Sequence, residues 1–508
     1  MSNQLDHDNI MIYTKMTESR TKIDHILNDY EKYVSQNVTI YGWIVTVRWQ
    51  KNQTFIKLFD SAKSRMTPIQ IICNKTIFGD TLNNLSAGCS LKIFGQVVKS
   101  PAKGQLFEIV AEKVVVLGIV NNPSAYPLDK GSLSIGTLRS IPHLECHTEY
   151  KSIIYTIRHG LMNAMTEYFN NNEFIKVDMP LITFSECEGG CQPMQATLLL
   201  TSGKSSDIPL VKNTSNVDFS QDFFGSKASL TVSAQMELET QLPLGNVWTM
   251  TRAIRGEPSQ TAKHLAEFSM LEFEMGFIDS AVDIMNVSED LIKYCIVYTL
   301  KNYSNELERL QSLHDTIYNV VPSDNKEKHI DLLNKYLTNS FVRITHASAV
   351  ELINSQDVLP KMKYDEDLSS ASEKYIVDYY KMPVIVMKYP KNVKAFYMPV
   401  VNETFEESRG VEHVDSFDIL VPDLGELVGG SKRIDNAEDL EKRIDELKLD
   451  RKPLEFYIEL RKNGSIPHGG MGMGFERLVK FITGVYSVKE CVAYPRYIGC
   501  NETNDLTD

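Results

Sequence analysis

The residues best suited to chemistry lie in three separated stretches of the sequence. In the first, residues 246–277, two strand-like runs, NVWTMTRAIRGE and LAEFSMLEFEMGF, are joined by the short polar segment PSQTAKH, and Arg255 and Glu257 end the first run. Acidic side chains on a strand that otherwise has a buried pattern need partners or ligands, so this stretch indicates either structural ion pairs or a binding site. Alternate residues of the second run share one face: Phe268, Met270, Glu272 and Glu274.

The other two stretches combine carboxylates, glycines and an arginine. In SFDILVPDLGELVGGSKR, Asp418 and Glu426 flank an apolar strand, and two carboxylates on neighbouring backbone suit Mg²⁺, which prefers carboxylate and phosphate oxygens. In HGGMGMGFERLVKFI, a Gly-rich strand passes into a helix with Glu476 and Arg477 at the junction. Glycines let the backbone approach a ligand closely, and an arginine at a helix start suits phosphate. Taken singly, each pattern is weak, because a lone G-x-G is common and usually structural.

The charge of the chain is unevenly distributed. The 508 residues carry a net charge of −13, which argues against a protein that coats itself in nucleic acid. Residues 34–118, however, hold ten Lys and Arg against four Asp and Glu, a balance of +6, so the remainder carries −19. A basic segment on an acidic body suggests a dedicated anion-binding module, with nucleic acid as the first candidate. The alternative is an accidental excess of charge on an ordinary domain.

The same basic segment has the pattern of a small β-barrel. Five short runs with a period of two lie between residues 38 and 118, separated by polar or Gly/Pro turns, and this number fits an OB-type barrel. On such a barrel Phe55 could stack on a base, flanked by Arg48, and Gln70 on a neighbouring strand could read a base edge. The alternative is that Phe55 belongs to the core and Gln70 faces solvent.

The rest of the chain supplies the elements that must hold the three stretches. We expect an N-terminal helical extension within residues 1–33, with a helix over 10–33, and a hinge over 119–150 in which Pro and Gly break any regular element. A long helix follows, then the strand IKVDMPLI, interrupted by Pro180. Other expected features are an inserted surface loop over 198–222, mainly helices between 278 and 385, and an amphipathic helix within 435–452.

Composition limits the class of protein. Hydrophobic residues make up 43% and charged residues 23% of the chain, which is ordinary globular usage, and 508 residues suffice for two or three domains. No apolar run reaches the roughly 20 residues of a membrane span, and the polar N-terminus is unlike a signal peptide. Eight cysteines are too few for a disulfide scaffold. We therefore expect a soluble, cytoplasmic protein with no membrane partner.

Taken in order, the motifs resemble those of class II aminoacyl-tRNA synthetases, and within that class the asparaginyl enzymes of the aspartyl/asparaginyl subgroup. The helix and strand around Pro180 resemble motif 1, RGE…TAKHLAEFSMLE resembles motif 2, and GMGMGFER resembles motif 3. The resemblance covers about residues 36–496. It implies an α+β fold, with a five-stranded OB-type anticodon-binding barrel (34–118) before a catalytic domain (151–508) built on an antiparallel sheet flanked by helices.

The resemblance also implies roles for individual residues. Arg255, Glu257 and Arg477 would be catalytic: Arg255 would grip the α-phosphate and the amino-acid carboxylate, and Arg477 would reach the γ-phosphate. Phe268 would stack on adenine. The residues implied to bind ATP are Arg255, Glu257, Lys263, His264, Leu265, Phe268, Glu426, Gly474, Phe475, Glu476 and Arg477.

The implied ligands complete this site. Asp418 and Glu426 would bind Mg²⁺, and Arg48, Phe55 and Gln70 would contact the tRNA anticodon. The residues implied to bind the amino acid are Glu188, Gln235, Glu239, Arg255 and Arg433. Motif 1 further implies a homodimer. The usual R-H-L of the family is Lys263-His264-Leu265 here, which keeps the charge but loses the bidentate fork of arginine.

The implied reaction is ATP-dependent activation of an amino acid. Its carboxylate attacks the α-phosphorus of ATP in line and expels pyrophosphate, after which the aminoacyl group moves to the 3′ end of tRNA. Such chemistry depends on positioning and on charge neutralisation, which fits a site rich in Arg, Lys and carboxylates.

The substrate choice depends on the segment SAQMELE, which we expect to be a strand. Aspartyl relatives carry Lys three residues after its Gln, whereas this sequence has Leu238 followed by Glu239, so asparagine and tRNA(Asn) are the favoured substrates. Three alternatives stay open: an aspartyl-tRNA synthetase, an asparagine-forming enzyme on the same fold, and a catalytically silent RNA-binding protein. The basic barrel counts against the second, and intact Arg255, Glu426 and Arg477 count against the third.

Overall fold

A computed structural model describes residues 20–129, 133–185, 193–317, 327–356, 358–401 and 409–500. The chain divides into two compact units, one of residues 1–156 with 312–321 and one of residues 157–311 with 322–508. No helix in these described parts of the chain is both long and apolar enough to cross a membrane.

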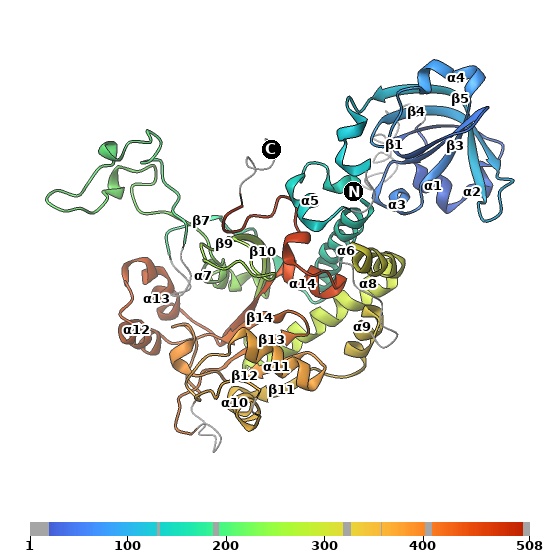
Figure 1. Ribbon diagram of the computed structural model, residues 1–508. Coiled ribbons are helices and arrows are strands. Elements are labelled where there is room, and N and C mark those ends of the chain that lie inside the picture. Colours follow the sequence, from blue (N-terminus) through green and yellow to red (C-terminus); the bar gives the residue numbers. More distant parts are fainter. Residues whose placement is uncertain are drawn as a thin grey trace, which may run out of the picture. The chain divides into compact units, whose positions relative to one another are not determined.

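The first unit contains the expected closed five-stranded barrel (Figure 1). Its strands pair in the order β1-β2-β3-β5-β4, and alternate residues such as Ile56 and Leu58 fill its interior. The five runs predicted from the period-two pattern are all strands. Their bounds are β1 (Asn37–Trp49), β2 (Gln53–Phe59), β3 (Ile69–Asn74), β4 (Ser90–Lys99) and β5 (Phe107–Gly118).

Helices of this unit differ from the sequence prediction in two places. The expected helix over 10–33, where described, is two short helices, α1 (Ile23–Asn28) and α2 (Tyr30–Tyr33), because Asp29 leaves the helical region with φ −147° and ψ 57°. The expected hinge contains a helix, α5 (Ile135–Ser140), whose first turn is capped by Ser134 and whose Ile135 and Leu138 are buried. Two further short helices accompany the barrel, α3 (Ala62–Met66) and α4 (Lys75–Leu82).

The second unit is built on an eight-stranded sheet in the order β11-β12-β13-β14-β15-β10-β9-β6. The six strands from β12 to β9 pair antiparallel, as predicted, but the edge pairs β11–β12 and β6–β9 are parallel. The sheet is therefore mixed. Its strands are β6 (Ile175–Lys176), β9 (Val247–Ile254), β10 (Glu267–Gly276), β11 (Val342–Thr345), β12 (Val384–Met387), β13 (Ser416–Val421), β14 (Gly425–Lys432) and β15 (His468–Gly474).

The run IKVDMPLI does not form one strand. Its first part is β6, and its last part is β7 (Ile182–Thr183), which pairs with β8 (Ser229–Leu230) in a separate small sheet. Pro180 lies between them, where its missing N–H ends the ladder. Residues 198–222 are mostly exposed, contain two 3₁₀ turns and an isolated β-bridge between Leu210 and Val217, and extend away from the sheet of this unit (green in Figure 1).

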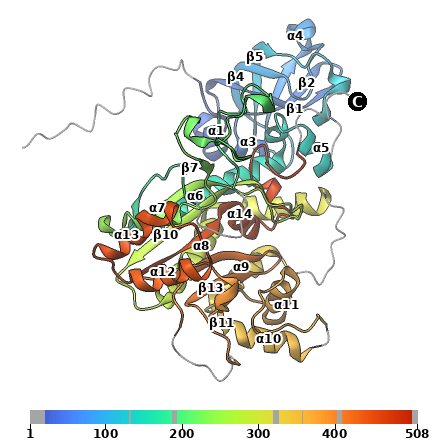
Figure 2. The same ribbon diagram turned by 90° about the vertical axis from the view of Figure 1, so that its left-hand side faces the viewer.

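Helices flank this sheet. In both views α10 and α11 lie beside β11 (Figures 1 and 2), and their apolar faces share a core with β12. The expected amphipathic helix within 435–452 is α12, and the region 278–385 is mainly helical but also supplies β11 and β12. The helices are α6 (Glu149–Asn171), α7 (Gln235–Glu239), α8 (Ala281–Ile317), α9 (His329–Thr338), α10 (His346–Ser355), α11 (Ser370–Tyr380), α12 (Ala437–Glu446), α13 (Glu455–Lys462) and α14 (Phe475–Thr483).

Candidate active site

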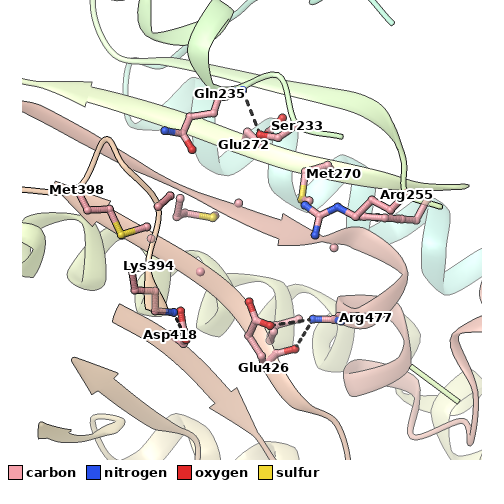
Figure 3. A pocket seen from close by; sticks show the side chains of 18 of the residues that line it. Ser233, Gln235, Arg255, Met270, Glu272, Lys394, Met398, Asp418, Glu426 and Arg477 are labelled. Carbon is pink, nitrogen blue, oxygen red and sulfur yellow. Dashed lines mark hydrogen bonds and ion pairs between the residues drawn. The ribbon is translucent and has the colours of Figure 1, made fainter. Parts of the chain in front are cut away.

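A cavity of about 770 Å³ lies in the second unit, over the sheet strands β10, β13, β14 and β15. This size suits a small-molecule or nucleotide ligand. Figure 3 shows how side chains from these strands, from α7 and from the β9–β10 connection converge on it. Most of the site residues expected from the sequence line it: Gln235, Arg255, Glu257, Lys263, His264, Leu265, Phe268, Asp418, Glu426, Arg433, Gly474, Glu476 and Arg477.

Two of the expected residues that the structure describes do not line the cavity. Glu239 and Phe475 are fully buried and do not line the cavity. The Phe475 ring instead packs against the guanidinium of Arg158, whose central carbon lies 4.5 Å from the ring centroid. This contact holds the first residue of α14 on the side away from the cavity. Glu188 lies outside the described residues.

The hairpin of β9 and β10 positions Arg255 and Phe268. The two strands pair antiparallel, as predicted, and Arg255 directly follows β9. Its guanidinium donates to the carbonyl oxygen of Val232 from Nη2 at 3.2 Å, and lies 5.5 Å from the centre of the Phe268 ring. The planar cation is thus fixed at the cavity wall beside a flat aromatic surface.

The junction of β15 and α14 positions Arg477. Its Nη1 donates to the main-chain oxygen of Glu426 at 2.9 Å, next to the Glu426 carboxylate. Glu476, the preceding residue expected to bind ATP, turns its carboxylate into the protein, where it accepts from the Ser269 N–H at 2.9 Å and from Arg158 at 2.8 Å. The carboxylate of Glu476 therefore supports the junction that presents Arg477.

Two carboxylates face the same glycine on the sheet floor. A Cβ added to Gly429 would lie 3.3 Å from Oε1 of Glu426 and 3.5 Å from Oδ1 of Asp418. Burial, aided by the charge of Glu426 and opposed by Lys394, raises the pKa of the Asp418 carboxyl to about 6. Burial acts in the same direction on Glu426, but the nearby cations, Arg477 foremost, outweigh it and lower the pKa of that carboxyl.

The other end of the cavity holds Gln235 and Arg433, backed by a buried ionic cluster. Nη2 of Arg433 lies 2.6 Å from the Glu274 carboxylate, and its Nε lies 3.6 Å from that of Glu239. Gln235 donates to Glu239 at 3.0 Å. Glu239 also accepts from Tyr457 and pairs with Arg461 and His468.

The expectation that Glu239 contacts a ligand directly therefore has to be corrected, because Glu239 is buried and does not line the cavity. Residues 235–239 form the helix α7 instead of a strand, so Gln235 and Glu239 are one helical turn apart, with Gln235 at the cavity and Glu239 behind it. Burial would raise the pKa of Glu239, but Arg461, His468 and Arg433 outweigh it and lower that pKa. Burial and the charge of Glu239 raise the pKa of Glu274 to about 7 against the effect of Arg433.

Comparison with known proteins identifies this arrangement. Residues 137–498 match the family model described as tRNA synthetases class II (D, K and N), and residues 38–117 match that of an OB-fold nucleic acid binding domain. A curated asparagine–tRNA ligase of Cytophaga hutchinsonii is 35% identical over 482 residues, covering 94% of this chain and 98% of that protein. The chain belongs to the class II tRNA synthetases.

Further relatives agree with this assignment. The asparagine–tRNA ligase of Azobacteroides pseudotrichonymphae is 37% identical and covers 91% of this class II synthetase. Among solved structures, asparaginyl-tRNA synthetase from Pyrococcus horikoshii complexed with asparaginyl-adenylate is similar with a TM-score of 0.77 and 26% identity, covering 95% of this chain and 99% of that one.

Several residues of the synthetase site were not found from the sequence. Lys394 lines the cavity and donates to Asp418 at 2.7 Å, yet nothing in its local sequence distinguishes it from a surface lysine. Glu272, noted only as an acidic strand residue, binds Ser233 and, at 3.0 Å, the N–H of Ala234, and so holds the start of α7. Both depend on partners far away in the sequence.

The barrel places the three candidate anticodon contacts on its outer surface. Phe55 lies between the buried Thr54 and Ile56, so its side chain points outward and is half-buried, and the alternative of a core Phe55 is wrong. On the neighbouring strand β1, the residue that pairs with Phe55 is Arg48, whose side chain is exposed. Gln70 on β3 is half-buried, and its amide donates to Glu108 at 3.0 Å.

Proposed function

We propose that the protein activates L-asparagine with ATP, forming asparaginyl-adenylate and pyrophosphate, and transfers the asparaginyl group to the 3′ end of tRNA(Asn). The observation that carries this proposal is the single cavity that joins Arg255, Arg477 and Glu426 to the Gln235 and Arg433 end. Its support is the similarity to asparagine–tRNA ligases over nearly the whole chain. Charging of tRNA with labelled asparagine, compared with aspartate, tests it.

The chain's own residues act by positioning and by neutralising charge. Arg255 binds the amino-acid carboxylate and the α-phosphate, which brings the attacking oxygen in line with phosphorus and offsets the charge that develops there. Arg477 binds the outer phosphates from the other side of the cavity, so the leaving pyrophosphate is also stabilised. No protein nucleophile is needed, since the carboxylate of the substrate attacks.

The Asp418 and Glu426 carboxylates fit a magnesium site. Both side chains offer oxygen ligands, and both face the space over Gly429. Mg²⁺ is usually bound by one or two carboxylates together with phosphate oxygens of the substrate. The ion would supply positive charge against the triphosphate. The described parts of the chain hold no group of three or more acidic, His or Cys ligands, so ATP oxygens and water would complete the shell.

We further propose that the barrel face bearing Arg48, Phe55 and Gln70 binds the anticodon. Replacing Phe55 with alanine should raise the KM for tRNA roughly five- to a hundredfold, because stacking on one base contributes about 1–3 kcal/mol. ATP–pyrophosphate exchange should be unchanged, since the reacting groups lie in the other unit. Phe94→Ala is a matched control, because Phe94 is an exposed aromatic residue on β4, which does not neighbour β2. Normal tRNA charging by Phe55→Ala would exclude the stacking role.

We also propose a cytoplasmic location for the protein. Motif 1 further supports a homodimer with two-fold symmetry. After α6 the chain exposes apolar side chains at Ile175, Leu181 and Phe184, with fractions of 45%, 41% and 56%. An isologous contact buries such a segment twice for one sequence. We expect light scattering at micromolar concentration to give twice the 57.7 kDa mass of the chain, and a monomeric mass would contradict the dimer.

A further inference from the structure

An ion pair ties the β9–β10 connection to a helix far away in the sequence. Nζ of Lys263 lies 3.1 Å from Oε2 of Glu373, a residue of the first turn of α11, 110 residues further along the chain. The two side chains are only 18% and 14% exposed. Lys263 lines the cavity, whereas Glu373 does not. The carboxylate therefore holds the ammonium from behind.

The pair lies directly on the turn that leads into β14. Gly425 has φ +84°, and a Cβ there would come within 2.3 Å of Oε2 of Glu373 and 3.3 Å of Nζ of Lys263. The N–H of Glu426 also points to the Glu373 carboxylate, at 3.4 Å. Gly425 thus makes room for the Lys263–Glu373 pair, and the pair lies against the backbone of Glu426, which is close to Arg477.

The connection that carries Lys263 is held through its backbone and through Leu265, which packs against Val488 and Val492. Its carbonyl at Ala262 accepts from the N–H of Val488 at 2.9 Å, and His264 bonds to Thr261 and Ser259 within the same loop. Lysine is a compact charge on a flexible stem, and burial of such a side chain costs considerable conformational entropy. Without a fixed partner, the ammonium would sample many positions.

We propose that Glu373 is a positioning residue for ATP: it orders Lys263 so that the ammonium faces the phosphate end of the cavity before ATP binds. This inference rests on the proposed function. An ammonium has three donors, so pairing with one carboxylate leaves donors for a phosphate oxygen.

A competing effect acts in the opposite direction. The charge of Glu373 repels a nearby phosphate and competes for Lys263. That repulsion is largely offset by the ammonium, which lies 3.1 Å from the carboxylate. The loss of order in Lys263 is not offset, so removing the carboxylate should weaken ATP binding.

The test compares Glu373→Gln with Asp378→Asn in ATP–pyrophosphate exchange. Both remove one charge from α11, but Asp378 pairs with Lys374 at the surface, where its side chain is 52% exposed. We expect Glu373→Gln to raise the KM for ATP at least about fivefold, with kcat changed less than KM, and Asp378→Asn to leave both unchanged. In a Lys263→Met background, Glu373→Gln should have no further effect on KM.

Each other outcome overturns the inference. An unchanged KM for ATP in folded Glu373→Gln means that Lys263 needs no positioning, and a lowered KM means that Glu373 competes with phosphate. Additive effects in the double variant mean that Glu373 acts elsewhere. Exchange by the unmodified protein and by Asp378→Asn shows whether the proposed function holds, so the two failures are separable.

Discussion

Alanine in place of Arg477 or Arg255 is expected to lower the rate of adenylate formation by at least about two to three powers of ten in a chain that still folds. A main-chain oxygen holds each guanidinium at the cavity wall, that of Glu426 at 2.9 Å from Arg477 and that of Val232 at 3.2 Å from Arg255. Such groups need little reorganisation when charge develops on the phosphates. The measurement is asparagine-dependent ATP–pyrophosphate exchange.

Arg252→Ala provides the matched control for this experiment. Arg252 lies on β9, three residues before Arg255, but its side chain is 47% exposed and its ion pair with Glu267 is long, at 3.9 Å. Its removal should leave exchange nearly normal. Near-normal exchange in folded Arg477→Ala or Arg255→Ala would refute the assignment of that residue.

Asparagine is expected to be activated at least about a hundredfold better than aspartate, measured as the ratio of kcat/KM in the exchange reaction. Arg433 lies at the proposed amino-acid end, where Glu274 at 2.6 Å and Glu239 at 3.6 Å already pair with it. A second carboxylate on the substrate would have to compete with these two for Arg433, and a mismatch of a buried charge costs several kcal/mol. Equal rates with the two amino acids would disprove the assigned specificity.

Glu239→Gln is expected to narrow the preference for asparagine over aspartate at least about tenfold. The substitution removes one of the negative charges that neutralise Arg433, so the side-chain carboxylate of aspartate binds there more easily. Lysine at this position is uninformative, since Glu239 is fully buried against Arg461 and His468 and a third cation there threatens folding. Glu237→Gln is the control, because Glu237 lies on the same helix but bonds to Thr183 instead. An unchanged ratio in Glu239→Gln would show that the cluster does not set specificity.

Much of this architecture follows from local sequence patterns. The five barrel strands have a clear period of two, and the β9–β10 hairpin and the β15–α14 junction lie where the runs around Arg255 and Arg477 predicted them. The helix α7 was mistaken for a strand because five residues are too few to distinguish the two periods. The helix α1 also packs Ile23 and Ile26 into the barrel core, a tertiary contact that the local pattern does not contain.

Side-chain partnerships were the hardest part to predict. Glu373 contacts Lys263 across 110 residues, and Lys394 contacts Asp418 across 24. Neither pair has a spacing that sequence rules cover, because strand order and loop path bring them together. Glu239 was expected to contact the amino acid but lies behind Gln235, because residues 235–239 form a helix instead of a strand.

The glycine at position 429 limits how the synthetase could escape an inhibitor. Because a Cβ there would lie 3.3 Å from the Glu426 carboxylate and 3.5 Å from that of Asp418, a resistant variant with a bulkier residue at 429 would also crowd the proposed magnesium site. A compound that fills this space should therefore select for resistance at flexible residues of the cavity wall such as Met270 and Met398.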